Sequence, residues 1–292
     1  MKTKVMLILT LICFFAAGVC FAKSGLSFIC GDGIVLGAAL NGEWQDPHSI
    51  DKYLKGGELF RFFSIDGAGK EKYRCSKPYC KKPGWRLWKV SFTPEPANLI
   101  TTTSTGLDAY FDSFEFAVCC DWNPVPRKIT VSTIPNNYDI EAAQQHLTSL
   151  QEKIPGRFSQ PELVIEQVIR GDFDGNGVDE TLITASSVKG EVSKNAGLKE
   201  MFLPKNPSIN DYSFIICRDS TNGPGKFYKL HEDAVDDIFN KFWKHRVGLV
   251  ADLDGDGCME IITQSATCQG GIYSMFRFNN GRPREFFGTV KN

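Results

Sequence analysis

Residues 168–186 read VIRGDFDGNGVDETLITAS, and residues 248–265 read GLVADLDGDGCMEIITQS. In both stretches, acidic or amide side chains alternate with apolar residues and glycines, and a glutamate stands directly before an apolar run. Recurrence of one pattern within a chain indicates two copies of one structural unit. Because Glu180 and Glu260 lead straight into β-forming residues, each copy predicts a strand, a loop and a second strand. We call residues 172–180 loop 1 and residues 252–260 loop 2.

The residue types in these loops point to calcium. This hard cation takes about six to eight oxygen ligands, which a tight loop supplies from alternate side chains and a backbone carbonyl. The glycines of the loops allow the positive φ values that such a curl requires. Without a cation, so many like charges would repel one another. The candidate ligands are Asp172, Asp174, Asn176, the carbonyl of Val178 and Glu180 in loop 1, and Asp252, Asp254, Asp256, the carbonyl of Cys258 and Glu260 in loop 2.

Other readings of the loops fit the spacing less well. The closing glutamate falls at the ninth position of each loop, whereas an EF-hand places it at the twelfth, so a standard EF-hand is excluded. Magnesium prefers a rigid octahedron that keeps several waters. An Asp-Gly-rich turn that binds nothing would account for one copy, but two copies with matched flanks favour calcium.

Both loops resemble the FG-GAP or VCBS-type repeats of bacterial exported proteins, whose calcium loops are similar to those of integrin-type β-propellers. LNGEW at 40–44 and YLKGGE at 53–58 are similar to the N-terminal part of uncharacterised members of that group. The resemblance implies a β-rich fold and structural calcium, and it implies no shared activity.

The remaining pattern predicts a mainly β protein with a few helices. Short β-leaning runs separated by turn residues indicate a β-rich N-terminal region, 23–127, which ends at the proline-stiffened stretch 121–127. The C-terminal region, 128–292, holds the two loops, an amphipathic helix at 138–154, a second helix at 233–244 and an exposed loop at 187–210. A short helical piece is expected at 46–54. With only two repeats far apart, we expect a partial propeller-like or β-sandwich arrangement.

The N-terminus predicts export. Lys2 and Lys4 precede an apolar run from Val5 to Ala17, and small residues lead to a cleavage site after Ala22, as in a secretory signal peptide of residues 1–22. The apolar run is shorter than the roughly 20 residues that span a bilayer, so a membrane anchor is not favoured. No later stretch is apolar enough to cross a membrane. The expected protein is periplasmic or secreted, and is not an integral membrane protein.

Charge and cysteines narrow the class further. Without residues 1–22, which hold two lysines, the chain has 31 basic and 34 acidic residues, and this slight excess of acid argues against nucleic acid as a partner. Eight cysteines remain in the mature chain. In an oxidising compartment they predict a disulfide framework, with Cys75 and Cys80 the expected local pair and with different partners for Cys119 and Cys120. The spacing does not match the repeated Cys-x2-Cys of zinc ribbons.

No motif assigns a reaction. The four histidines stand in no catalytic pattern, and His245 is expected at a helix end; Gly-x-Ser-x-Gly and His-Glu-x-x-His are absent from the sequence. The stretch 74–89 mixes basic residues with aromatic ones and is a candidate contact surface for a protein or glycan ligand. The sequence therefore favours an exported calcium-binding scaffold that is not an enzyme. The alternative is an exported hydrolase with structural calcium and an unmarked active site.

Overall fold

The chain is mainly β, as predicted. The computed structural model describes residues 25–31, 34–45, 52–65, 67–77, 90, 92–95, 116–153, 162–188, 190–192, 202–204, 211–220, 225–235, 242–267 and 270–291. Within these ranges all strand pairs are antiparallel, the strands form open sheets, and one α-helix packs against them from outside. Among the described residues, no helix is long and apolar enough to cross a membrane.

The first sheet has seven strands and uses the N-terminal region. Its order is β3 (Glu43–Gln45), β2 (Ile34–Leu40), β1 (Leu26–Gly31), β7 (Phe116–Cys119), β4 (Leu59–Ser64), β5 (Gly67–Cys75) and β6 (Phe92–Glu95). Asn41 and Gly42 join β2 to β3 with φ values of 51° and 79°. Positive φ at both central residues matches the right-handed twist of a tight hairpin. The connecting stretch 120–129, near the expected boundary, then leads out of this sheet.

The two loops lie in two further sheets. The second sheet has the order β14 (Phe227–Ala234), β13 (Tyr212–Arg218), β10 (Glu180–Ser186), β9 (Ile165–Gly171) and β8 (Thr130–Ser132). The third has the order β15 (Lys244–Ala251), β16 (Glu260–Thr267), β17 (Gly270–Asn279) and β18 (Arg282–Lys291). Loop 1 joins β9 to β10 and loop 2 joins β15 to β16, so both repeats are strand, loop and strand, as expected.

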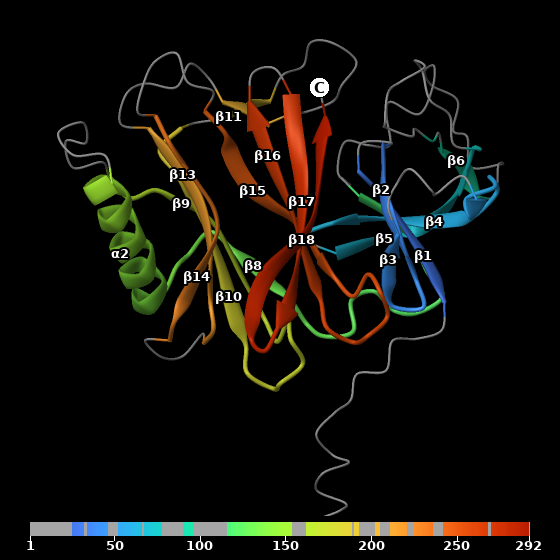
Figure 1. Ribbon diagram of the computed structural model, residues 1–292, viewed down its shortest axis with the longest axis horizontal. Helices are drawn as coiled ribbons and strands as arrows, with labels where there is room; N and C mark the ends of the chain where they lie inside the picture. The colour runs from blue at the N-terminus through green and yellow to red at the C-terminus, as the bar shows by residue number, and fades with distance from the viewer. Residues whose placement is uncertain are drawn as a thin grey trace, which may run out of the picture.

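The three sheets are stacked in layers, with the third sheet in the middle. Figure 1 shows helix α2 (Asn137–Lys153) on the outer face of the second sheet, then the second, third and first sheets in turn. Along β15 and β16, neighbouring residues supply opposite cores. Leu249 and Ile262 pack with residues of the first sheet, whereas Val250 and Ile261 pack with residues of the second. The middle sheet is therefore apolar on both faces.

Helix α2 is fixed at its first turn. Asn136 Oδ1 accepts a hydrogen bond from the Asp139 N–H, and Asp139 Oδ2 accepts one from the Asn136 N–H, each at 2.9 Å. This reciprocal cap satisfies donors that an open helix end leaves bare. The buried Asp139 carboxylate also pairs with Arg218 at 2.7 Å and with Arg170, which ties the helix to β13 and β9. Of the apolar residues that stand at three- and four-residue spacing in this helix, Ala143, Leu147 and Leu150 are buried, but Ile140 is exposed.

Three expectations about the rest of the chain need correction or lie outside the description. The predicted helix 233–244 is wrong at both ends. Asp233 and Ala234 belong to β14, where they face Ser213 and Tyr212 of β13, and Lys244 starts β15. The helical spacing arises because Val235 and Phe242 pack with Val188 in a small cluster. The central residues of that helix, 236–241, and most of the expected helix 46–54, lie outside the described residues.

The described part of the stretch 187–210 differs from the exposed loop that we expected. It contains a two-stranded ribbon, β11 (Gly190–Val192) and β12 (Phe202–Pro204), paired in antiparallel fashion. The strand β12 contacts β15 and β16 of the third sheet. Two segments of this stretch therefore pair with each other, where the polar composition had predicted only an exposed loop.

Candidate metal centres

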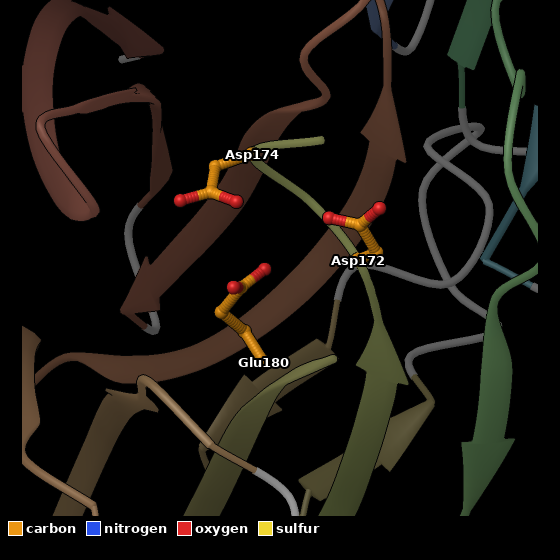
Figure 2. Close-up of side chains that lie close together, drawn as sticks. All are labelled: Asp172, Asp174 and Glu180. Carbon is orange, nitrogen blue, oxygen red and sulfur yellow. The ribbon is translucent and has the colours of Figure 1, made fainter. Parts of the chain in front are cut away.

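Loop 1 brings three carboxylates together where β9 gives way to β10. Ligand atoms of Asp172, Asp174 and Glu180 all lie within 4.8 Å of one another. Figure 2 shows the three carboxylates converging on one space, Asp172 and Asp174 from the loop and Glu180 from the start of β10. The backbone can turn here because Gly175 and Gly177 have φ values of 77° and 86°, which confirms the predicted role of these glycines.

The other two predicted ligands of loop 1 shape the turn. Asn176 donates from its side-chain amide to Asp174 Oδ2 at 3.0 Å, and its Oδ1 accepts the Val178 N–H at 2.7 Å. The Val178 side chain is exposed. Meanwhile the Phe173 N–H donates to Glu180 Oε2 at 2.7 Å, which fixes the glutamate against the loop backbone.

Loop 2 repeats this arrangement in a more enclosed place. Ligand atoms of Asp252, Asp254 and Glu260 again lie within 4.8 Å, and all three side chains are buried. The Leu253 N–H donates to Glu260 Oε2 at 2.8 Å, as Phe173 does to Glu180 in loop 1. Asp252 Oδ1 and Oδ2 accept the N–H groups of Gly255 and Gly257 at 2.7 and 3.2 Å.

Asp256 and Cys258, also predicted as ligands, stand at the side of this cluster. Asp256 is not among the carboxylates that lie within 4.8 Å of one another, and its Oδ1 accepts the Cys258 N–H at 2.6 Å. Asp256 therefore corresponds to Asn176 of loop 1, whose Oδ1 accepts the Val178 N–H in the same way. The Cys258 thiol points out of loop 2 and donates to the Asp174 carbonyl of loop 1 at 3.3 Å.

The crowding of charge shows in the acid–base properties of both loops. Burial raises the pKa of Glu180 to about 8, and the charges of Asp174 and Asp172 add to the rise against the hydrogen bond from Phe173. Burial and the neighbouring Asp256 raise the pKa of Asp254 to about 6. Burial and Asp254 raise the pKa of Glu260 well above its usual range. Ionising these groups together is costly, and a bound cation removes that cost.

The donor set fits a hard cation. Every side chain in the two clusters offers carboxylate oxygen, which suits calcium and magnesium and gives no sulfur or imidazole for a softer metal. In loop 1, the buried Oδ1 of Asp172 has no hydrogen-bond partner, and a buried polar atom is normally paired. A cation between the three carboxylates of loop 1 would satisfy this oxygen.

The two loops are joined to each other and to the stretch 120–129, which sequence reasoning missed. The Met259 N–H of loop 2 donates to the Phe173 carbonyl of loop 1 at 2.7 Å. Trp122 Nε1 donates to the Asp252 carbonyl at 2.9 Å, and the Asp252 N–H donates to the Pro124 carbonyl at 2.7 Å. Arg127 Nε donates to the Asp172 carbonyl at 2.5 Å. No periodic signal in the sequence reports such contacts, because they join residues far apart in the chain.

His231 and His245 form a stacked pair between strands, and His245 does not lie at the helix end that the sequence predicted. His245 lies in β15, where its Nδ1 is 2.7 Å from Ser265 Oγ, and its ring stacks on His231 with centroids 4.9 Å apart. His231 Nε2 is in turn 2.7 Å from Thr263 Oγ1. Burial lowers the pKa of His231 to about 4 and that of His245 well below its usual value. Because Ser265 and His245 are each only 5% exposed, this pair is not accessible to a substrate in the folded protein.

Two sequence predictions fall partly or wholly on residues that lie outside the described ranges. The signal peptide, residues 1–22, is one, and most of the candidate contact surface 74–89 is the other. The described cysteines are Cys30, Cys75, Cys119, Cys120, Cys217 and Cys258, and none of the first five is bridged to another described cysteine. Cys80 and Cys268 lie outside the description, so the expected Cys75–Cys80 pair stays a prediction.

Comparison with known proteins gives no match: no family model, curated protein or solved structure is significantly similar to this chain.

Proposed function

We propose that the protein is an exported calcium-binding scaffold, with one calcium ion in each loop. Asp172, Asp174 and Glu180 would hold one ion, and Asp252, Asp254 and Glu260 the other. Asn176 and Asp256 would complete the turns, and the carbonyls of Val178 and Cys258 would supply backbone oxygen. The observation that carries the proposal is the repetition of one carboxylate cluster, with one hydrogen-bond pattern, at the same place in two sheets.

The role proposed for calcium is structural. Each loop closes the first hairpin of its sheet, and the loops touch each other and the stretch that leaves the first sheet. Ser27 of β1 also donates from its hydroxyl to the Leu253 carbonyl of loop 2 at 2.5 Å. An ion that neutralises each cluster would therefore stabilise the junction of all three sheets. The scaffold would present its loops to a protein or glycan ligand outside the cytoplasm.

Metal content tests the proposal directly. The full mature chain, purified without chelator, should contain about two calcium ions per molecule by elemental analysis. Calorimetry should show binding of calcium in preference to magnesium and no stoichiometric binding of zinc. Protein without bound metal that also fails to bind added calcium would refute the proposal.

A second measurement addresses activity and partners. Glycan-array binding and a substrate panel for glycosidase, esterase and phosphatase activity should be run on the same preparation, with and without chelator. The scaffold proposal expects binding without turnover. Turnover that chelation abolishes, while the melting temperature stays the same, would assign the metal to an active site.

A further inference from the structure

The two loops contact each other at residues that adjoin the proposed metal ligands. The Met259 N–H of loop 2 donates to the Phe173 carbonyl of loop 1 at 2.7 Å, and Met259 directly precedes Glu260 in the chain. At its other side, the Phe173 N–H donates to Glu180 Oε2 at 2.7 Å. The backbone of Phe173 therefore connects a carboxylate of loop 1 with the residue that stands next to a carboxylate of loop 2.

A second contact joins the loops beside the first. The Cys258 thiol donates to the Asp174 carbonyl at 3.3 Å. Asp174 supplies a carboxylate to the cluster of loop 1, and the Cys258 carbonyl is the proposed backbone ligand of loop 2. Phe173 and Met259 are fully buried in one apolar core, so the hydrogen bond between them is shielded from water. Each proposed site thus lies within one residue of a direct contact with the other.

The two loops are anchored differently. In loop 2, the carbonyl that corresponds to that of Phe173 belongs to Leu253, and it accepts the Ser27 hydroxyl of β1 at 2.5 Å. Loop 2 is therefore fixed to the first sheet, whereas loop 1 is fixed to loop 2. The Phe173 carbonyl also accepts a hydrogen bond from Arg127 at 3.2 Å, so it is held from two sides. The position of the Glu180 carboxylate then depends on how well loop 2 is ordered.

We propose that the two loops bind calcium with positive cooperativity, an inference that rests on the proposed function. An ion in loop 2 fixes Glu260 and the Cys258 carbonyl, which lie on either side of Met259 in the chain. The Met259 N–H then holds Phe173, and the Phe173 N–H aligns Glu180 for the ion of loop 1. The first ion orders this path, so the second ion binds with a smaller loss of entropy. Coupling is reciprocal, so each ion strengthens binding of the other by the same factor, about five- to twentyfold.

Repulsion between the ions acts in the opposite direction, because an ion in one loop weakens the field that attracts a second ion. Each cluster has three carboxylates, however, so a loop that holds one calcium ion still has no net positive charge when all three are ionised. Salt screens charges that face water, and loop 1 is partly open to water. Added potassium chloride should therefore leave the cooperativity intact or increase it, whereas cooperativity that arose from charge alone would weaken.

The distribution of bound calcium tests the proposal on the unaltered chain. The mature protein is freed of metal with chelator and titrated with calcium chloride, and native mass spectrometry counts the forms with zero, one and two ions. Two independent sites, whatever their affinities, let the singly occupied form reach at least half of the molecules. Coupling of about fivefold or more keeps that form below half, even when the affinities of the loops differ about tenfold.

We therefore expect the singly occupied form to stay below half at every calcium concentration. A singly occupied form that reaches half would overturn the cooperativity while leaving the calcium sites in place. Protein that binds no calcium at all would refute the proposed function instead.

Variants at Cys258 show whether contact between the loops transmits the effect. Cys258→Ala removes the thiol that donates to Asp174, and Cys258→Ser keeps a donor at the same place. The largest fraction of the singly occupied form should rise in Cys258→Ala and stay closer to that of the wild type in Cys258→Ser. Equal fractions in the wild type and in Cys258→Ala would overturn the assigned path.

Single-loop variants measure the size of the coupling. Asp254→Ala and Asp174→Ala each leave one working loop, whose association constant calorimetry gives at a temperature where circular dichroism shows the variant folded. The product of these two constants should be about five- to twentyfold smaller than the overall constant of the wild type for two ions. Equality would show that the loops are independent and would overturn the proposal. If a variant does not fold, the distribution of calcium in the unaltered chain decides.

Discussion

Loops 1 and 2 have the same local design in different surroundings. In both, the closing glutamate accepts a hydrogen bond from the N–H of the second loop residue, which is Phe173 in loop 1 and Leu253 in loop 2. The side chain of Asn176 or Asp256 likewise accepts the N–H of the residue two positions later. Loop 2 belongs to the middle sheet and is enclosed by β1 and the stretch 120–129, so Asp252 and Asp254 are each 4% exposed. In loop 1, Asp172 and Asp174 are only partly buried.

The comparison shows how tertiary burial changes the energetics of one motif. Asp252 of loop 2 accepts two glycine N–H groups, whereas Oδ1 of Asp172 in loop 1 has no partner. Each loop also has an arginine beside it: Arg127 lies 3.7 Å from Asp172 Oδ2 in loop 1, and Arg277 lies 3.6 Å from Asp254 Oδ2 in loop 2. Charge in loop 2 is thus more completely removed from water, so the folded state there depends more strongly on a bound cation.

The largest expected effect is the loss of calcium from both loops. An ion at a hundredfold excess over its dissociation constant stabilises the folded state by about 2.7 kcal/mol, so chelation of two sites should lower the melting temperature by roughly 10 to 20 °C. Asp254→Ala should reproduce much of this loss in excess calcium, and the matched variant Asp174→Ala should cost less. Thermal melts of both variants check this.

The same melts in chelator supply the control. Without the ion, the Asp254 carboxylate is buried beside Asp252 and Asp256, so removing it relieves repulsion. Asp254→Ala should then melt at or above the wild-type temperature. If it melts far below the wild type in chelator too, the residue stabilises the fold through direct contacts, and the comparison of the loops fails.

The next effect concerns how the free energy of unfolding depends on pH, and its sign should differ between the metal-free and the calcium-bound protein. In the metal-free protein the pKa values of Asp254 and Glu180 are raised to about 6 and about 8, so the folded state holds protons that the unfolded chain has released. The free energy of unfolding should therefore fall as pH rises. The fall extends from about pH 4 to 6 through Asp254 of loop 2, and up to about pH 8 through Glu180 of loop 1. With calcium the free energy of unfolding should rise, because protons compete for the same oxygens.

Melting temperatures at pH 5, 6, 7 and 8, with calcium and with chelator, measure this. The gap between the two curves should widen toward pH 8. Parallel curves would mean that the carboxylates do not bind the ion. Glu180→Gln should reduce the slope of the chelator curve between pH 6 and 8, where Glu260 of loop 2 also contributes, and it should leave the part below pH 6, where Asp254 titrates, unchanged.

A smaller effect is the difference in calcium affinity between the loops. Asp256 adds a negative charge to loop 2 where loop 1 has the neutral Asn176, and affinity rises with ligand charge. We expect loop 2 to bind calcium more tightly by roughly three- to tenfold, or about 0.7 to 1.4 kcal/mol. In calorimetry, Asp256→Asn and Asn176→Asp should each narrow the difference in affinity, and the double variant should reverse it. Tighter binding by loop 1 in the wild type would contradict this order.

The smallest effect concerns the arginine that holds loop 1. Arg127 donates to the carbonyls of Asp172 and Phe173 at 2.5 and 3.2 Å, so Arg127→Ala should destabilise the protein by about 1 to 2 kcal/mol. The neighbouring Lys128 has an exposed side chain, and Lys128→Ala should leave the melting temperature nearly unchanged. Equal effects of the two substitutions would show that the contacts of Arg127 contribute little.

Much of the C-terminal fold could be predicted because its signals are local. The apolar runs that follow Glu180 and Glu260 form strands β10 and β16. Ala143, Leu147 and Leu150, which are spaced three or four residues apart, form the buried face of α2. The same periodicity misled at 233–244. There, backbone pairing of Asp233 and Ala234 with β13 outweighed the helical spacing of the apolar residues, because burial between sheets overrides weak helix propensity.

The sequence by itself determined the two strand-loop-strand units, their oxygen donors and the glycines that let each loop turn, because a tight loop is built from residues adjacent in the chain. Only the tertiary structure decided that the loops touch, that Arg127 and Trp122 hold them, and that loop 2 is the more buried. These relations join residues tens or hundreds of positions apart, and they depend on how three sheets stack to bury their apolar faces, a property that no local pattern encodes.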